Sequence, residues 1–336
     1  MASARIPVVS VAMKAYDHRP YVAYAIQSVL DQSFGDFELL VTDDGSTDGT
    51  PDVIASFTDE RIRFERSEIN RGAAAAMNAT VQRARGEYVA ILNSDDFALP
   101  GRLAAQVAFL REHPDVAAVF SVPVQVGESG EPVEGFGSIF AIPFADPNAS
   151  RCAWLRHLFL RSNCLCAPSA MIRRSALAVI GPDDVRLAHL LDLDRWVRLL
   201  KDHELRVLEQ PLTAFRVRAN QANASAARRD TLLRDAFESC RIFKRYLGFD
   251  AALLREIFAE DIAREGIDPG IPSAALLGEI ALTGRNVWHP FFALECLFEA
   301  ARDGYGVRRL RELTGRVDAF RLLAGNAARG AEAPPI

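Results

Sequence analysis

Apolar and polar residues follow two different periods through the first part of the chain. Short runs rich in β-branched residues predict strands. Between these runs the apolar residues recur at helical spacing, as Val22, Ile26, Val29 and Leu30 do. The predicted strands cover residues 7–13, 37–42, 61–65, 88–93 and 116–126, and the predicted helices cover 21–32, 50–57, 72–84 and 102–113. Strands that alternate with helices predict an α/β fold with a mostly parallel, Rossmann-type sheet flanked by helices.

The pattern changes in the second part of the chain. Residues 127–150 are rich in Gly and Pro and predict a β-hairpin followed by a long loop. From residue 226 the sequence becomes amphipathic and helical, and the final residues 326–336 predict a disordered tail. We therefore expect an α/β domain over residues 1–225 and a helical region over residues 226–325.

Composition narrows the class of protein. The chain has 336 residues, of which 49% are hydrophobic and 25% charged, enough for one large core or two smaller ones. The net charge is −5 and the basic residues are dispersed, so we expect no nucleic-acid partner. Five irregularly spaced cysteines favour a reducing compartment over a disulfide framework. No signal peptide or membrane span stands out, so we expect a cytoplasmic protein.

Two pairs of carboxylates follow two of the predicted strands. Asp43 and Asp44 come after residues 37–42, and Asp95 and Asp96 come after residues 88–93. The carboxyl ends of parallel strands lie at one edge of a sheet, where ligands usually bind. Such carboxylates can instead cap helices and form turns. Two clusters at one edge favour a site for Mg²⁺ or Mn²⁺ and a diphosphate, because these ions prefer oxygen ligands.

The residues around these strands resemble a known family. The runs VSVAMKAYDHRPYVAYAIQSVLDQSFGDFELLVTDDGSTDGT and NRGAAAAMNATVQRARGEYVAILNSDDFALPGRL are similar to the nucleotide-sugar domain of glycosyltransferase family 2. The resemblance is dense over residues 6–125 and continues more weakly to residue 225. It implies a GT-A fold and an inverting enzyme, with a nucleotide-binding half over 6–125 and an acceptor half over 126–225.

The resemblance assigns roles to single residues. Ala15 and Tyr16 match the nucleotide-binding motif after the first strand, where the tyrosine stacks on the base. Asp43 matches the aspartate that accepts a hydrogen bond from the base. Asp95 matches the ribose contact, and Asp96 matches the ligand of Mn²⁺ or Mg²⁺.

Several positions depart from the family pattern. The usual D-x-D-D motif begins here with Asn93, and the usual R-N pair ends in Asn78 but lacks its arginine. Asn78 is nevertheless expected to contact the nucleotide, and Arg71 could supply positive charge to the diphosphate. Arg218 stands where histidine is common; it cannot bind a metal, but it can bind phosphate oxygens.

The segment HLLDLDRWVRLL is similar to the part of the family that carries the general base. The match places the base at Asp192, with Leu191 in place of the usual glutamate. Asp194 is the second candidate, and Trp196 is expected in the core or at the sugar pocket. Acidic residues at this point could also simply complement a helix dipole.

The function implied is transfer of a sugar from a nucleotide-diphosphate sugar to a saccharide or lipid-linked acceptor, in surface polysaccharide or glycoconjugate synthesis. Uridine or thymidine suits Asp43 best, and guanosine stays open. A nucleotidyltransferase should carry a Gly-rich loop, which MKAYDHRP lacks. A non-catalytic nucleotide-sugar-binding or scaffold module is the remaining alternative. Residues 226–325 could form an acceptor cap, a homodimer surface or a contact with the inner face of the membrane.

Overall fold

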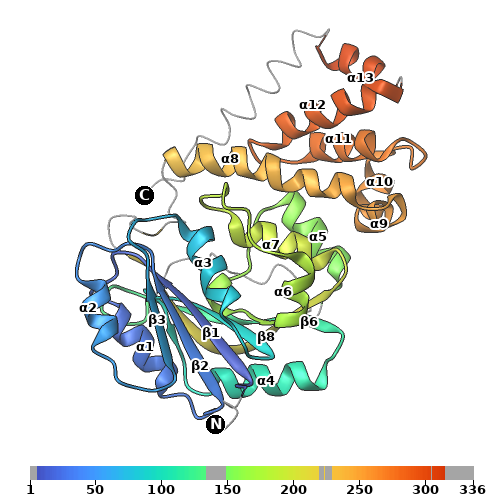
Figure 1. Ribbon diagram of the computed structural model, residues 1–336. Coiled ribbons are helices and arrows are strands. Elements are labelled where there is room, and N and C mark those ends of the chain that lie inside the picture. The colour runs from blue at the N-terminus through green and yellow to red at the C-terminus, as the bar shows by residue number, and fades with distance from the viewer. Residues whose placement is uncertain (1–5, 134–148, 219–222, 224–228, 304, 315–336) are drawn as a thin grey trace. The chain divides into compact units, whose positions relative to one another are not determined.

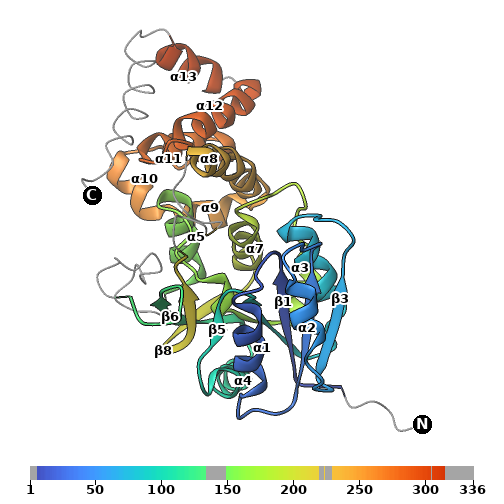
Figure 2. The same cartoon turned by 90° about the vertical axis from the view of Figure 1, so that its left-hand side faces the viewer.

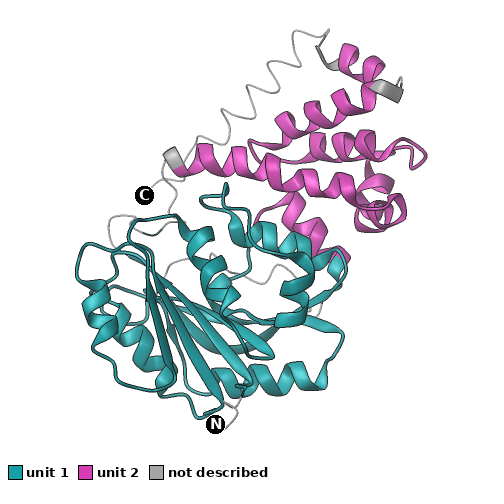
Figure 3. Cartoon of the chain, in the orientation of Figure 1, with its two compact units in different colours: residues 1–151, 164–228 teal, residues 152–163, 229–336 magenta. Residues whose placement is uncertain are grey.

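The computed structural model describes residues 6–133, 149–218, 223, 229–303 and 305–314 (Figure 1). The chain forms two compact units (Figure 3). Unit 1 contains residues 1–151 and 164–228, and unit 2 contains residues 152–163 and 229–336. The short segment 152–163 therefore leaves unit 1 and joins the C-terminal helices.

Unit 1 is built on an eight-stranded sheet with the order β3-β2-β1-β4-β7-β6-β8-β5. The first four strands in that order are parallel, β7 is antiparallel to both of its neighbours, and β6 runs parallel to β8. Figure 2 shows β1 and β3 towards one side of the sheet and β6 and β8 towards the other. The strands are β1 Val9–Ala15, β2 Phe37–Asp43, β3 Ile62–Arg66, β4 Tyr88–Asn93, β5 Phe97–Ala98, β6 Val116–Val126, β7 Met171–Arg173 and β8 Glu204–Arg216.

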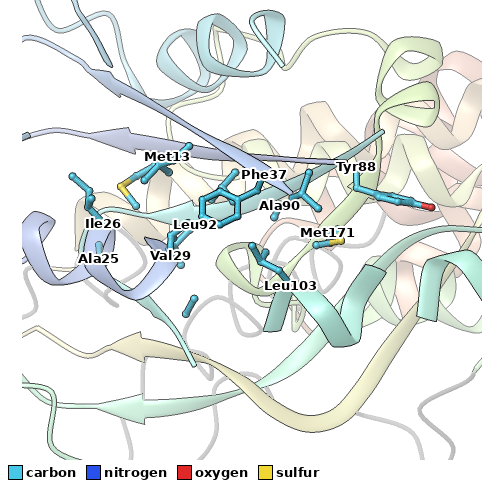
Figure 4. Close-up of a cluster of buried hydrophobic side chains, with 14 of the residues drawn as sticks. Met13, Ala25, Ile26, Val29, Phe37, Tyr88, Ala90, Leu92, Leu103 and Met171 are labelled. Carbon is cyan, nitrogen blue, oxygen red and sulfur yellow. The ribbon is translucent and has the colours of Figure 1, made fainter. Parts of the chain in front are cut away.

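Helices cover this sheet, as the α/β pattern predicted. They are α1 Val22–Leu30, α2 Thr50–Ala55, α3 Ala73–Gln82, α4 Arg102–Glu112, α6 Arg174–Ile180 and α7 Leu191–Leu200, with the 3₁₀ turn η1 Ala167–Ser169. Figure 4 shows Ile26 and Val29 of α1 beside Met13 and Leu92 of the sheet, within one buried cluster. The predicted fold class is thus confirmed. The central parallel strands β1, β2 and β4 are buried almost throughout, which explains why their sequences are largely apolar.

Unit 2 is helical. It contains most of α5 Arg151–Leu160, then α8 Arg229–Phe243, η3 Lys244–Gly248, α9 Ala251–Ile257, α10 Ala259–Glu265, α11 Ser273–Thr283, α12 His289–Glu299, η4 Ala300–Asp303 and α13 Tyr305–Thr314. Phe159 of α5 is fully buried among aromatic rings whose centroids lie 5.1–5.6 Å away. Arg156 of α5 also binds both carboxylate oxygens of Asp261. Helix α5 is therefore part of the core of unit 2.

Some sequence expectations lie outside the described residues. These are residues 326–336, most of the predicted loop over 127–150, and parts of the helical region near 226–228 and 315–325. The described start of the predicted hairpin forms a single antiparallel bridge between Val126 and Pro132. Within the part of the chain that the structure describes, we find no helix long and apolar enough to cross a membrane.

Candidate active site

Two loops at the carboxyl ends of β1 and β2 are fastened to each other. The backbone N–H of Asp17 donates to Ser46 Oγ at 2.9 Å, and the N–H of Thr47 donates to Asp17 Oδ1 at 2.9 Å. Asp17 has a φ of 48°, so the chain turns sharply there. Ala15 ends β1 in register with Asp43, and the next residue, Tyr16, is 44% exposed. A rigid loop thus presents an exposed aromatic ring beside the end of the sheet.

Asp43 carries a buried oxygen atom that lacks a donor. Its Oδ2 accepts a hydrogen bond from the N–H of Ser46 at 3.1 Å and lies 3.7 Å from Arg66 Nε. Its Oδ1 has no hydrogen-bond partner among the described residues, although the side chain is fully buried. A buried acceptor without a donor is costly, so this atom is suited to accept a hydrogen bond from a ligand donor or from water.

Asp44 has a different environment from Asp43. Its two carboxylate oxygens accept hydrogen bonds from the backbone N–H groups of Arg71 and Gly72, at 3.0 and 2.8 Å. The Arg71 side chain is exposed and donates to Ser67 Oγ at 2.9 Å. Asp44 therefore shapes the loop that carries Arg71, and this is a structural role.

Asp96 is held from two sides at the end of β4. The backbone N–H of Arg216 donates to its Oδ1 at 2.8 Å, and Asn93 Nδ2 donates to its Oδ2 at 2.9 Å. Asn93 in turn accepts a hydrogen bond from Lys14 Nζ at 3.2 Å. Burial and the neighbouring Asp95 both raise the pKa of Asp96 well above its usual range. The asparagine that replaces the family's first aspartate thus acts here as a donor to Asp96.

Asp95 faces a pair of basic side chains. Its Oδ2 lies 3.7 Å from His18 Nε2, and its side chain is 13% exposed. His18 Nδ1 lies 2.7 Å from Ser94 Oγ, while Nε2 lies 3.1 Å from Arg218 Nη1. Burial lowers the pKa of His18 despite the opposing effect of Asp95. His18 was not among the predicted site residues; its position two residues after Tyr16 is the signal that could have found it.

Arg216 and Arg218 differ in what they can bind. Arg216 uses its guanidinium for the carbonyl groups of Asp95 and Gly127, at 2.8 and 2.9 Å, and of Glu128. Arg218 lies over the ring of Tyr21, and its buried Nε has no hydrogen-bond partner among the described residues. Arg218 is therefore the more available of the two for an anionic ligand.

The predicted base lies in the first turn of α7. Asp192 is partly buried, and its Oδ1 accepts a hydrogen bond from the N–H of Leu193 at 2.9 Å. Burial raises the pKa of the Cys166 thiol, and the charges of Asp96 and Asp192 raise it further.

The two other candidates on α7, Asp194 and Trp196, are buried and contact neighbouring side chains. Asp194 is buried, and its Oδ2 pairs with Arg198 Nε at 2.8 Å. Trp196 is fully buried and packs edge-to-face on Phe120, with the ring centroids 4.8 Å apart. Of the two positions expected for Trp196, the structure shows the core.

Asn78 connects the two halves of unit 1. Its Nδ2 donates to the carbonyl group of Asp183 at 2.9 Å, and its Oδ1 accepts from the N–H of the same residue at 2.8 Å. The Asp183 carboxylate pairs with Arg195 and, at 3.2 Å, with Arg198 of α7. The amide that was expected to contact the nucleotide thus holds the segment in front of α7.

Few side chains at the site could hold a divalent cation. Among the described residues, no group of three or more His, Cys, Asp and Glu side chains could hold a metal ion. An ion that binds chiefly through a diphosphate needs only one or two protein ligands. Asp95 Oδ2 and His18 Nε2 are 3.7 Å apart and are both ligand types that Mn²⁺ accepts. The donor set therefore fits an ion that is shared with a diphosphate.

Comparisons with known proteins give the family and the fold of the chain. The model of the family described as glycosyl transferase family 2 matches residues 10–181. Among characterised relatives, the chain is similar to the Escherichia coli enzyme named UDP-Glc:alpha-D-GlcNAc-diphosphoundecaprenol beta-1,3-glucosyltransferase WfgD. The two are 36% identical over 103 residues, which is 31% of this chain and 41% of that protein.

Two solved structures share the fold. S. aureus TarS 1–349 in complex with UDP-GlcNAc has a TM-score of 0.57 and 18% identity, and the match covers 92% of each chain. The mannosyltransferase PcManGT from Pyrobaculum calidifontis, in complex with GDP-Man and Mn2+, has a TM-score of 0.56 and 19% identity. That match covers 98% of this chain and 82% of PcManGT.

Proposed function

Since the chain belongs to glycosyl transferase family 2 and is a glycosyltransferase, we propose that it transfers sugar from a nucleotide diphosphate with inversion at the sugar carbon. The observation that carries this proposal is the buried, donor-less Oδ1 of Asp43 beside the exposed ring of Tyr16. A base that stacks on Tyr16 can direct an N–H at Asp43. Ala15, which ends β1 next to Tyr16, is a further proposed contact to the nucleotide.

The preferred donor carries uridine or thymidine. The N3–H of either base supplies the single donor that Asp43 lacks, whereas N3 of cytosine is itself an acceptor and offers the carboxylate no hydrogen bond. TarS binds UDP-GlcNAc and PcManGT binds GDP-Man, so nucleotides of both kinds occur on this fold. Asp95 is the proposed ribose contact.

Mn²⁺ or Mg²⁺, held by aspartates at the end of β4, would neutralise the leaving diphosphate together with arginine side chains of the site. Asp96 is the predicted metal ligand, and to bind the ion its Oδ2 would exchange the Asn93 amide for the metal. Asp95 is the more accessible of the two carboxylates. When bound, such an ion acts as a Lewis acid on the phosphate oxygens. Arg218 and, from the loop held by Asp44, Arg71 are the proposed contacts to the diphosphate.

Asp192 is the proposed general base. It would take the proton from the acceptor hydroxyl as that oxygen attacks the sugar carbon, while the nucleotide diphosphate leaves from the opposite side. Asp194 is a poorer candidate than Asp192 because it is buried and engaged with Arg198, whereas Asp192 is only partly buried. Asn78 and Asp183 support this arrangement by fixing the segment that leads into α7.

The acceptor is a saccharide, and we favour a lipid-linked one in surface polysaccharide or glycoconjugate synthesis, as in the name of WfgD. In unit 2, Phe237 of α8 and Phe291 and Phe298 of α12 are 63%, 69% and 70% exposed. An ion pair joins Lys244 of η3 to Glu295 of α12, and Arg241 of α8 lies over the Phe237 ring. Aromatic side chains beside basic ones suit the surface of an anionic membrane.

Co-sedimentation with anionic vesicles tests this contact. Replacing the three phenylalanines by serine should abolish it. A homodimer through the same helices would instead show as a concentration-dependent mass that these substitutions change.

Thermal stability with added nucleotides tests the donor site. UDP, dTDP, GDP and CMP are compared, each with and without Mn²⁺. A ligand at about 100 times its Kd adds about 2.7 kcal/mol to the free energy of unfolding. A rise with UDP or dTDP that needs Mn²⁺ supports the proposal, and no rise with any nucleotide contradicts it. Release of UDP from UDP-sugars in the presence of acceptor then separates an enzyme from a non-catalytic binding module.

A further inference from the structure

His18 lies beside Asp95 and Arg218, which are the proposed contacts to the ribose and the diphosphate. We propose that His18 and Asp95 together bind the divalent cation for which Asp96 is the predicted ligand. This inference rests on the proposed function. The imidazole reaches the site from the loop after β1, whereas position 218 follows β8.

The orientation of the ring is fixed by its neighbours. The backbone N–H of His18 donates to Thr50 Oγ1 at 2.9 Å, and Nδ1 lies 2.7 Å from Ser94 Oγ. Arg218 can only donate hydrogen bonds, so Nε2, at 3.1 Å from Arg218 Nη1, must be the acceptor. The ring proton is therefore on Nδ1 and is donated to Ser94. This tautomer leaves a lone pair on Nε2, as metal binding requires, and Ser94 is the group that orients it.

The separation from Asp95 suits a shared ion. Two neighbouring ligand atoms of an octahedral Mg²⁺ or Mn²⁺ ion stand about 3 Å apart, given bonds of about 2.1 Å. His18 Nε2 and Asp95 Oδ2 are 3.7 Å apart, so a small side-chain rotation brings them to that spacing. The remaining positions of the ion are then open to diphosphate oxygens and water.

Arg218 has a second role in the proposed cation site. Its Nη1 occupies the lone pair of His18, and an arriving ion takes that lone pair in its place. The released guanidinium, whose buried Nε also lacks a partner among the described residues, can then bind the diphosphate oxygens. Arg216 cannot do this, because its guanidinium is fixed by the carbonyl groups of Asp95 and Gly127. Loading of the ion and capture of the diphosphate are thereby coupled.

The test measures Mn²⁺ binding rather than activity. Free Mn²⁺ is followed by electron paramagnetic resonance as it is titrated into protein with saturating UDP. His18→Ala should raise the Kd for Mn²⁺ at least about tenfold, as loss of metal-site residues commonly does. His113→Ala, which alters a histidine outside the site, should not change it. The double variant His18→Ala with Arg218→His, which moves the imidazole to the other position, should regain part of the affinity.

A second measurement does not depend on any variant folding. Electron spin echo modulation of the wild-type complex with UDP and Mn²⁺ should show a directly bound imidazole nitrogen. Absence of that nitrogen, or an unchanged Kd in His18→Ala, overturns the assignment. Wild-type protein that binds UDP but no Mn²⁺ overturns this assignment and the metal role together. Such a result would leave the transferase activity to be judged by release of UDP.

Discussion

Replacement of Asp43 by asparagine tests the nucleotide site most directly. The carboxylate has two acceptor oxygens. Oδ2 accepts a hydrogen bond from the N–H of Ser46, and Oδ1 has no donor among the described residues. Asparagine keeps one acceptor and turns the other into a donor. Whichever way the amide is turned, it loses either the Ser46 hydrogen bond or the proposed one to N3–H of uracil. A hydrogen bond to a charged group contributes about 1.5–3 kcal/mol, so UDP should bind about 10- to 150-fold more weakly.

The same substitution carries its own control. An amide N–H directed at the base can donate to N3 of cytosine, so CDP should lose little affinity or gain some. Isothermal titration of UDP and CDP into Asp43→Asn and wild-type protein, in the presence of Mn²⁺, measures this preference. Thermal unfolding verifies that the variant is folded. Equal UDP affinity in the two proteins would show that Asp43 Oδ1 does not face the base, and the proposed donor site would be wrong.

Three further outcomes are expected. Asp192→Asn should lower kcat by about 10²–10⁴-fold with little change in donor affinity. Asp194→Asn should instead chiefly lower the Tm. Equal kcat in Asp192→Asn and wild type would exclude Asp192 as the base. Phe159→Ala should destabilise unit 2 by about 3–5 kcal/mol in denaturant unfolding, and a change under 1 kcal/mol would contradict its central place in that core. Burial lowers the pKa of His289 to about 4 from an ordinary 6.5, so its contribution to stability is complete above pH 6.5. About 3 kcal/mol of that stability should be lost as the pH falls from 6.5 to 4, and His289→Gln should flatten this part of the unfolding curve.

The central sheet was predictable because burial leaves a strong pattern. Residues 116–126 were expected as a strand and form β6 over the same residues. Strand β8 was not expected, since Pro211 and several exposed polar residues interrupt its apolar pattern. Its position is set by pairing with β6, a contact between segments far apart in the chain. The two-residue strand β5 is too short for any periodicity to show.

The site was predictable where it follows from strand ends, and less so where it depends on long-range contacts. Asp43 ends β2 and Asp95 follows β4, and both strands run parallel to β1, which lies between them. The partner of Asn78 is Asp183, more than a hundred residues away, and no local pattern indicates it. The pairing of Asp194 with Arg198 was visible in the sequence as an i, i+4 pair on one helix.

The membership of α5 in unit 2 has a consequence for synthesis on the ribosome. Residues 152–163 emerge well before α8 to α12, yet they belong to unit 2, where Phe159 is buried among aromatic rings of the later helices. Until those helices have been translated, the Phe159 ring lacks the core that buries it. During this interval the nascent chain exposes an apolar segment that is prone to aggregation, and such exposure favours chaperone binding. A fragment that stops at residue 228 keeps the nucleotide site but carries that segment permanently, and we expect it to aggregate.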